Sequence, residues 1–306
     1  YGVLELGMDK KGEIDYLSKI LQPNISVITN INYAHAKNFK NIKEIALAKS
    51  EIIHNTQANG HVILNADDRF FKFHQNIALK KNLNVVSFGI KNLKSDVKFI
   101  KIKKNMKNFQ ITIEMNNLRK NFTILNNFQS NIYNTLSALA IISVYVDIFQ
   151  LDERFFLNFK TPSGRGDLLK VKIKKKTINL IDETYNSNPL SLKSAILNYD
   201  KINSKGSKKY LLIGDMLELG RLSNKLHLSI APIINRTKVD KVFVKGKKAQ
   251  LIFKKLNKSK RGKVLKNKQD IIKLIKNRLN NNDYLMIKAS NATGFNKIVR
   301  NLKGLN

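Results

Sequence analysis

Residues 25–65 read ISVITNINYAHAKNFKNIKEIALAKSEIIHNTQANGHVILN. The short apolar runs at residues 25–31 and 61–65 have the length and composition of β-strands. Between them, residues 42–56 show the apolar spacing of an amphipathic helix. A strand, a helix and another strand in this order predict a βαβ unit with parallel strands.

The same alternation continues on both sides of this stretch. Residues 3–6 and 84–88 read as further strands and residues 13–22 as a further helix, which predicts a parallel sheet wrapped by helices. Three alternating runs predict an antiparallel insert, near residues 97–103, 109–115 and 121–125. A long helix from about Ser130 to Val146 is expected to close this domain.

A second α/β domain is predicted in the other half of the chain. Residues 160–167 (KTPSGRGD) concentrate turn formers, so we expect one domain at residues 1–163 and another at 164–306. The second domain is expected to be doubly wound and Rossmann-like. Its expected strands lie at residues 168–173, 177–181, 210–213, 241–244 and 284–287, with helices starting near Leu190, Ser223, Asp270 and Phe295.

Composition restricts the possible functions. The chain of 306 residues has no cysteine, so disulfides and thiolate metal sites are excluded. No apolar run approaches the roughly 18 residues of a membrane span, and we expect a cytoplasmic monomer. The net charge of +34 raises the alternative of a basic nucleic-acid-binding module, but only 9 of the 56 basic residues are arginine. Base readers favour arginine, and we expect no specific nucleic acid partner.

A lysine falls on the apolar stripe of the helix expected at residues 42–56. Ile42, Ile45 and Ala46 begin the stripe, and Lys49 takes the next position on it. Its stem could pack while the ammonium reaches water, which is the more common arrangement. Alternatively, burial could alter the chemistry of the amine. The helical spacing alone leaves both alternatives open.

Polar residues follow the expected first and second strands. Glu5 and Gly7 come after the first, and Asn30 and His35 after the second. Ligand sites of parallel sheets lie at the carboxyl ends of strands, although each residue alone could also be a solvated or capping side chain. A carboxylate and an imidazole near Mg²⁺ would suit a phosphate-transfer site, because the cation offsets phosphoryl charge.

Nine short motifs along the chain resemble the Mur ligase family in order and spacing. They are ELGMDKKGEIDYL (5–17), TNINYAHAKNF (29–39), ALAKSEI (46–52), NADD (65–68), SNIYNTLSALA (130–140), SGR (163–165), IDETYNSNP (181–189), GDMLELG (214–220) with His227, and IKAS (287–290). The resemblance covers essentially the whole chain. It implies a central ATP-binding domain followed by the C-terminal domain of the family.

The resemblance also implies roles for individual residues. Glu5 and His35 would hold Mg²⁺, and Lys49 would match a lysine that is carbamylated in the family, so that it assists the metal as an anion. The implied nucleotide-binding residues are Asn30, Asn131, Asn134, Arg165, Glu183, Tyr185, Asn186 and Asn188. Asp215, Lys288 and Ser290 would line the side of the amino substrate.

The activity that the resemblance implies is acyl activation by ATP followed by aminolysis. GDMLELG favours the MurF type, which joins D-alanyl-D-alanine to UDP-MurNAc-tripeptide through an acyl phosphate in peptidoglycan precursor synthesis. A DNPR signature of the MurE type is absent from the sequence. A MurE-type ligase or a folylpolyglutamate synthase is the alternative within the superfamily.

The sequence departs from the family pattern at several points. Residues 1–306 contain no GxxGK[ST] phosphate loop and no N-terminal substrate-binding domain, so we expect a central sheet that is incomplete at its N-terminus. That loop fixes the phosphates of ATP in this superfamily, and we therefore expect residues 1–306 alone to be inactive. Ser130, Glu183, Ala289 and Asn291 also differ from the residues usual at these positions.

Overall fold

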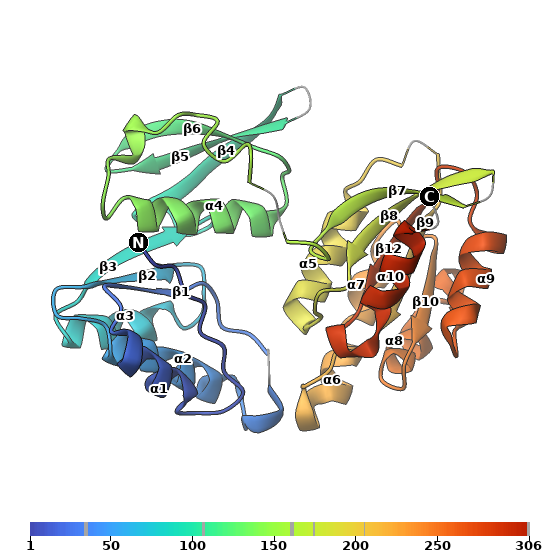
Figure 1. The fold of residues 1–306 in the computed structure, drawn as a ribbon, viewed down its shortest axis with the longest axis horizontal. Coiled ribbons are helices and arrows are strands. Elements are labelled where there is room, and N and C mark those ends of the chain that lie inside the picture. The colour runs from blue at the N-terminus through green and yellow to red at the C-terminus, as the bar shows by residue number, and fades with distance from the viewer. Residues whose placement is uncertain (34–35, 106–107, 160–161, 174, 205, 305–306) are drawn as a thin grey trace. The chain divides into compact units, whose positions relative to one another are not determined.

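The computed structural model describes residues 1–33, 36–105, 108–159, 162–173, 175–204 and 206–304. The chain divides into two compact α/β units, Tyr1–Phe159 and Lys160–Asn306. This division falls a few residues before the boundary expected after residue 163. Each unit has its own sheet and its own buried apolar core, and each is described by itself (Figure 1).

A mixed sheet of six strands forms the centre of the first unit, in the order β1-β2-β3-β4-β5-β6. The pairs from β1 to β4 are parallel, and β4, β5 and β6 pair antiparallel, as the alternating runs predict. The strands are β1 (Ile25–Ile28), β2 (His61–Asn65), β3 (Asn84–Gly89), β4 (Val97–Asn105), β5 (Asn108–Met115) and β6 (Leu118–Ile124).

Helices cover both faces of this sheet. Three lie on one face, namely α1 (Glu13–Leu21), α2 (Ile42–His54) and α3 (Phe71–Lys80), and α4 (Gln129–Ile142) lies on the other (Figure 1). Alternate residues of β2 belong to the apolar clusters on the two faces of this sheet: Val62 and Leu64 pack with α2, whereas Ile63 packs with α4. The strand is thus buried on both faces, as expected for parallel pairing.

The strand expected at residues 3–6 is absent. This segment has no regular secondary structure, and Val3 and Leu4 are 96% and 65% exposed. An extended run becomes a strand only when its backbone groups pair with a neighbour, and no pairing of residues 3–6 with β1 is present. The apolar pattern of the segment was therefore a misleading indication of a strand in the sheet.

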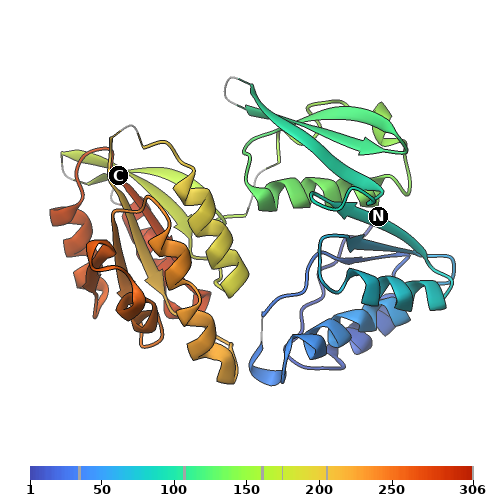
Figure 2. The ribbon, with the colours of Figure 1, turned by 180° about the vertical axis from the view of Figure 1, so that it is seen from behind.

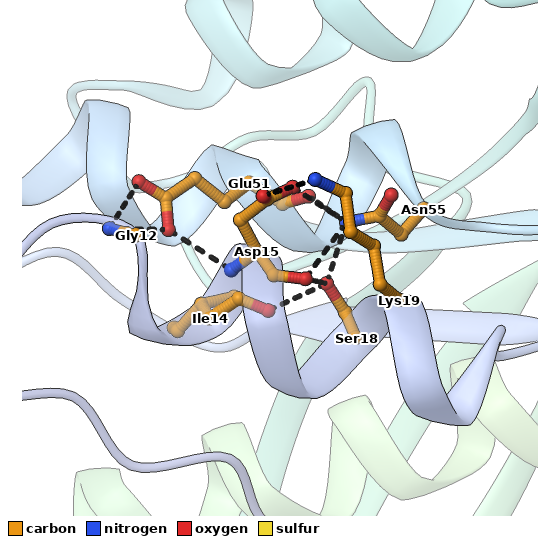
Figure 3. A network of polar contacts seen from close by, with 7 residues as sticks. All are labelled: Gly12, Ile14, Asp15, Ser18, Lys19, Glu51 and Asn55. Atoms are coloured by element: carbon orange, nitrogen blue, oxygen red, sulfur yellow. Dashed lines mark hydrogen bonds and ion pairs between the residues drawn. The ribbon is translucent and has the colours of Figure 1, made fainter.

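A network of polar contacts joins α1 to α2 (Figure 3). The N-terminus of α1 has no side-chain cap of its own. Instead, the Glu51 carboxylate of α2 accepts the backbone N–H groups of Gly12 at 2.9 Å and Asp15 at 3.0 Å. Asn55 donates to the Asp15 carboxylate at 2.9 Å and to the Ser18 hydroxyl at 2.9 Å. Helix α2 thus supplies the anion that the amino end of α1 favours.

The second unit also contains a sheet of six strands, in the order β11-β10-β9-β12-β8-β7. All pairs are parallel except β7 with β8. Helices α9 and α10 cover one face and α5, α7 and α8 the other (Figures 1 and 2). The strands are β7 (Asp167–Ile173), β8 (Lys176–Glu183), β9 (Lys209–Gly214), β10 (Lys241–Lys245), β11 (Arg261–Val264) and β12 (Tyr284–Lys288).

The helices of the second unit begin in different ways. They are α5 (Pro189–Asp200), α6 (Ser223–Leu228), α7 (Ala231–Asn235), α8 (Ala249–Lys255), α9 (Lys268–Arg278) and α10 (Phe295–Lys303). Asn188 and Ser191 form a capping box at α5, with Pro189 at the first turn, and Asn267 caps α9. Helix α8 has no side-chain cap from its own N-cap residue.

Several elements differ from the sequence-based expectation. The sequence did not predict α3, α7, α8 or β11, and α4 ends at Ile142, before the expected end at Val146. Residues 143–146 instead form turns, in which Tyr145 and Val146 are about half exposed. None of the helices in the described part of the chain is long and apolar enough to cross a bilayer.

Candidate functional site

Lys49 lies on α2, the helix that begins at the Asn41 cap and packs against β1. The Asn41 side chain accepts the backbone N–H groups of Lys43 and Glu44, which fixes the first turn. Ile45, Ala46, Ala48 and Ile53 are fully buried on this helix, whereas Lys49 is half-buried. The amine therefore sits at the edge of an apolar stripe.

The half-buried amine of Lys49 interacts electrostatically with two carboxylates. Burial lowers the pKa of Lys49 below its ordinary value, and the nearby Glu5 and Asp68 carboxylates oppose this shift. Asp68 is held in place, because its two carboxylate oxygens accept the N–H groups of Ile31 and Phe70, both at 2.8 Å. Lowering the pKa enlarges the neutral fraction of the amine, which is its nucleophilic form.

His74 is a buried neighbour of this group on α3. Its Nε2 lies 3.1 Å from the carbonyl oxygen of Ala46, and the side chain is 2% exposed. Burial lowers the pKa of His74, the hydrogen bond to the Ala46 carbonyl oxygen and the Asp68 charge oppose this shift, and the Lys49 charge adds to it. The ring thus stays neutral and links α3 to the helix that carries Lys49.

Two of the three expected magnesium ligands, Glu5 and Lys49, lie in the described part of the chain. His35 lies outside the described residues, and Glu5 is exposed in the irregular segment before α1. The described residues contain no group of three histidine or acidic side chains arranged to hold a metal ion. Two carboxylates beside an amine would fit a divalent cation only if Lys49 carried no positive charge.

The asparagines expected near the nucleotide lie at the surface of the first unit. Asn30 follows β1 and is exposed, and Asn134 is exposed on α4. Asn131, half-buried on the same helix, donates from Nδ2 to the carbonyl oxygen of Asn126 at 3.4 Å. No hydrogen bond within the described part of the chain joins Asn30 to either of the two residues on α4.

On the same helix α4, Tyr133 forms a half-buried contact with Asp67 in the loop after β2. The Tyr133 hydroxyl donates to the Asp67 carboxylate at 2.8 Å. The carboxylate also accepts the backbone N–H groups of Ile90 at 2.6 Å and Asn92 at 2.7 Å. These hydrogen bonds lower the pKa of Asp67 although desolvation opposes them, and burial raises the pKa of Tyr133. The contact fixes α4 on the sheet.

A polar cluster lies at the carboxyl ends of β8 and β12 in the second unit. Lys288, at the end of β12, has a side chain that is 3% exposed, and its ammonium lies 3.1 Å from the Glu183 carboxylate of β8. It also donates to the carbonyl oxygen of Asn186 at 3.0 Å. The ammonium therefore has two acceptors that offset the cost of its burial.

The loop after β9 is hydrogen-bonded to the same cluster. The Ser290 hydroxyl accepts the N–H of Leu217 at 2.9 Å and donates to the carbonyl oxygen of Ser187 at 3.1 Å. The N–H of Ser290 donates to the carbonyl oxygen of Asp215 at 3.2 Å. Ser187 has a buried hydroxyl without a partner in the described residues, so this site holds a polar atom with unused capacity.

Asp215 and His227 hold the first residues of that loop in place. The Asp215 carboxylate accepts the N–H groups of Lys248 at 3.0 Å and Ala249 at 2.7 Å, so it caps α8 from a distant part of the sequence. His227, fully buried on α6, accepts the N–H of Met216 on Nε2 at 3.0 Å. Its Nδ1 lies 2.7 Å from the Ser223 carbonyl oxygen, which requires the Nδ1–H tautomer.

The remaining expected residues lie at the start of the second unit and before α5. The Arg165 guanidinium stacks over the Tyr185 ring, with its carbon 4.2 Å from the ring centroid. Both side chains are exposed, as is that of Asn186. Asn188 has a structural role as the N-cap of α5. The structure therefore brings Arg165 together with Tyr185, and Glu183 together with Lys288.

Two family models match the chain. The Mur ligase middle domain matches residues 1–142, and the Mur ligase glutamate ligase domain matches residues 165–291. The chain belongs to the Mur ligase family. The two matches cover the two sheets and all the site residues above, and the resemblance stated from the sequence motifs is confirmed.

Curated relatives of this Mur ligase match nearly its whole length. A UDP-N-acetylmuramoyl-tripeptide–D-alanyl-D-alanine ligase from Rickettsia prowazekii is 30% identical over 302 residues, covering 98% of this chain and 65% of the relative. A ligase of the same name from Buchnera aphidicola subsp. Acyrthosiphon pisum is 32% identical over 317 residues, covering 99% and 65%. The chain thus spans about 65% of the length of these relatives.

Solved structures of the family share the fold. A MurF structure from Acinetobacter baumannii has a TM-score of 0.84 at 24% identity, covering 99% of this chain and 65% of that one. A MurF ligase from Thermotoga maritima in complex with ADP has a TM-score of 0.80 at 22% identity, covering 99% and 67%. The predicted pair of α/β domains is thereby confirmed.

Sequence reasoning missed parts of this Mur ligase site. It did not assign roles to Asp68, His74 or Ser187. Asp68 could have been inferred from the paired carboxylates of NADD after a strand, since strand ends build sites in parallel sheets. His74 and Ser187 gave no local signal, because their roles depend on burial against residues far away in the sequence.

Proposed function

We propose that this chain forms part of an ATP-dependent amide ligase that joins D-alanyl-D-alanine to UDP-MurNAc-tripeptide in peptidoglycan precursor synthesis. One observation carries the proposal: relatives with this printed name match 98% and 99% of the chain, across both candidate sites. The proposal places the enzyme in the cytoplasm as a monomer.

The chemistry is acyl activation followed by aminolysis. The terminal carboxylate of the tripeptide takes the γ-phosphoryl group of ATP, and the amine of D-alanyl-D-alanine then attacks the acyl phosphate. Phosphate leaves from the acyl carbon, ADP remains from the first step, and the attacking amine loses a proton. The residues of this chain position the reactants and stabilise the charge of the phosphoryl group.

The metal site is proposed to include Lys49 and the residues near it. Glu5, His35 and a carbamylated Lys49 would hold Mg²⁺, which offsets negative phosphoryl charge when bound. Support comes from the lowered pKa of Lys49, since only a neutral amine reacts with carbon dioxide to form a carbamate. Carbamylation would also replace an unfavourable positive charge with an anion beside the cation.

Labelled bicarbonate tests the carbamate without any assay of activity. The chain in ¹³C-bicarbonate should show a carbamate carbon signal by NMR, and Lys49→Met should lack it. Lys72→Met is the matched control on α3, because that lysine lies at the surface and contacts Gln75. A carbamate signal that persists in Lys49→Met would reject this assignment.

Nucleotide-binding residues are proposed for each unit by itself. Asn30, Asn131 and Asn134 in the first unit, and Arg165, Glu183, Tyr185, Asn186 and Asn188 in the second, would contact the nucleotide. Arg165 is suited to phosphate, since its planar guanidinium can form two parallel hydrogen bonds to phosphate oxygens. Its stacking on Tyr185 limits the orientations of the guanidinium before a ligand binds.

The amino substrate is proposed to bind at the carboxyl ends of β9 and β12. Lys288, Ser290 and Asp215 lie there: the Ser290 N–H donates to the Asp215 carbonyl oxygen, and the Lys288 ammonium pairs with the Glu183 carboxylate. Calorimetric titration of D-alanyl-D-alanine should detect binding that Ser290→Ala weakens. Ser229→Ala is the control, since the Ser229 hydroxyl donates only to the Leu226 carbonyl oxygen at the exposed end of α6.

ADP release with both substrates tests the whole proposal. Residues 1–306 alone are expected to show no turnover, since they contain no GxxGK[ST] loop. A longer chain that supplies such a loop should release ADP only when D-alanyl-D-alanine and the tripeptide are both present, and Lys49→Met should abolish the release. Acceptance of diaminopimelate, lysine or glutamate instead of D-alanyl-D-alanine would reject the specificity and retain the ligase class.

A further inference from the structure

The antiparallel part of the first unit has a polar outer face. One face of β4, β5 and β6 belongs to the core, where Ile111, Ile113 and Phe122 are fully buried. The opposite face is defined by cross-strand partners: Lys101 pairs with Thr112, and Thr112 with Asn121. Lys103 pairs with Gln110 one step along the same face. This face takes no part in the function proposed above.

A β-bulge in β4 gathers lysines on this face. The register shifts between Phe99 and Lys101, so that Lys98 lies opposite Glu114 and Lys101 opposite Thr112. With strict alternation, Lys98 and Lys101 would point to opposite faces. The extra residue in the bulge therefore places Lys98, Lys101 and Lys103 on one side of the sheet, as bulges do when they redirect side chains.

The face is hollowed between these side chains. The hollow has a volume of about 230 Å³ and is lined by Lys101, Lys103, Gln110, Thr112, Arg119, Lys120 and Asn121. Sites for drug-sized ligands are about 300–1,000 Å³, so this hollow suits a smaller molecule. Its walls are formed by donors from three strands, with no apolar side chain among those lining residues.

The charges in the hollow are not balanced. Glu114 is the one carboxylate on this face in the described residues, and both of its oxygens are engaged, by Lys98 at 2.8 Å and by Arg119 Nε at 2.7 Å. Lys101 and Lys103 have no hydrogen-bond or ion-pair partner among the described residues. Asn121 accepts the Thr112 hydroxyl on Oδ1 at 2.7 Å, which leaves its NH₂ group as a donor.

We propose that this hollow binds a small phosphate-bearing anion of the size of inorganic phosphate or pyrophosphate. Two ammonium groups and an amide NH₂ are donors without a competing carboxylate, and charge-assisted hydrogen bonds to phosphate are the strong ones. An anion would also relieve the repulsion between the neighbouring lysines. The lining residues include none of those assigned above to the nucleotide, so the proposal stands without the ligase assignment.

An NMR titration of the ¹⁵N-labelled chain tests the proposal. Pyrophosphate, phosphate and sulfate are added separately at constant ionic strength, which separates site binding from general screening. Saturable shifts of the Thr112 and Asn121 amides are expected with pyrophosphate or phosphate. An equal response to sulfate at the same concentration would mean that any oxyanion is tolerated and would overturn the phosphate class.

Matched variants locate the site. Lys101→Gln with Lys103→Gln should weaken binding at least roughly tenfold, because both charge-assisted hydrogen bonds to the anion are lost. Lys104→Gln is exposed on the same strand, opposite Phe109 on the other face, and should change nothing. Asn121→Asp keeps the acceptor for Thr112 but adds a carboxylate to the hollow, and it should abolish binding.

Two results would overturn the site. One is the absence of saturable shifts at Thr112 and Asn121 in the unaltered chain. The other is an equal loss of affinity in Lys104→Gln and in the double variant, which would indicate attraction by the overall charge. Dispersed spectra of all variants establish that they are folded, and ADP release is not used, so failure here leaves the ligase proposal untouched.

Discussion

Lys288 carries a nearly buried ammonium, so the stability of the second unit depends on the partners of this charge. Replacing Lys288 by methionine keeps the stem but leaves Glu183 and the Asn186 carbonyl oxygen without their donor. Loss of one member of a buried pair costs about 3–5 kcal/mol, and we discount this to about 2 kcal/mol because Glu183 is 20% exposed. Urea unfolding of the second unit, followed by NMR of its core methyl groups, measures the change.

The Lys303 ion pair provides the matched control. Lys303 lies 3.5 Å from Asp182 and is 34% exposed, and the Asp182 carboxylate keeps its two hydrogen bonds from Thr184, so Lys303→Met should cost less than Lys288→Met. Glu183→Gln added to Lys288→Met should recover part of the loss, because the unpaired carboxylate is removed. If the single and double variants were equally destabilised, repulsion and desolvation at Glu183 would not be the cause.

His227 makes the stability of the second unit depend on pH. Burial lowers its pKa in the folded protein, although the Ser223 carbonyl oxygen and the Asp215 charge oppose the shift and Lys248 adds to it. The unfolded chain therefore binds the proton first as the pH falls below about 6.5, and the folded state loses stability down to the folded pKa. Above that window, the contribution of the neutral ring is fully present.

His227→Gln tests this dependence, because glutamine can still accept the Met216 N–H but does not titrate. We expect the unfolding free energy of the unaltered chain to fall more steeply between pH 7 and 5 than that of the variant, in a range set by the ordinary histidine pKa of about 6.5. The other histidines are common to both proteins and cancel in the difference. Parallel curves would contradict the assignment.

At the scale of elements, α8 depends on a cap from a distant loop. Gly246 has φ of +132°, and a Cβ there would lie 2.2 Å from Asp215 Oδ1, the oxygen that holds the first N–H groups of the helix. Gly246→Ala should therefore destabilise the second unit by more than about 2 kcal/mol, through backbone strain and displacement of the cap. Faster hydrogen exchange at Lys248 and Ala249 would accompany the loss.

Gly294→Ala separates strain from displacement. Gly294 also has a positive φ, of +77°, but a Cβ there would meet nothing within 4 Å. Only the left-handed conformation is penalised, at about 1–2 kcal/mol. If the two alanine variants were equally stable and exchange at α8 were unchanged, displacement of Asp215 would be excluded.

The same distant cap explains which elements the sequence could predict. Strands β1, β2 and β12 could be predicted from their apolar runs alone. Helix α5 could be predicted from its own start signals, Asn188 and Pro189. Helix α8 has no local cap, since its anion is Asp215. Strand β11 has only four residues and an irregular register, and so gives no pattern. Residues 3–6 show the reverse, an apolar run without a pairing partner.

The candidate site was predictable to a similar extent. Helical spacing identified Lys49 as a lysine on an apolar stripe, because that depends on its own helix alone. Its neighbour His74 could not be found in this way, since its contact with Ala46 joins two helices. The contact between Glu183 and Lys288 could not be found locally either. The pairing of β8 with β12 brings these two residues together from distant parts of the sequence.

For the whole molecule, the charge of +34 predicts binding to nucleic acid without sequence preference. Such binding arises from release of counterions and declines steeply with salt. We expect fluorescence anisotropy to detect duplex DNA binding at low salt and to lose it by a few hundred millimolar, equally for unrelated sequences. Tight binding that survives high salt would instead favour the alternative of a basic nucleic-acid-binding module.

The core of each unit is built from one continuous stretch of the sequence. The buried residues of the first unit's clusters lie between Ile28 and Ile148, and the large cluster of the second lies between Val171 and Leu302. In the gene, each core is thus one uninterrupted block of codons. A single crossover between related genes, between the codons for Ile148 and Val171, would exchange one complete core for another and leave no hybrid interior, so recombination could pair the two halves in new combinations at little risk to folding.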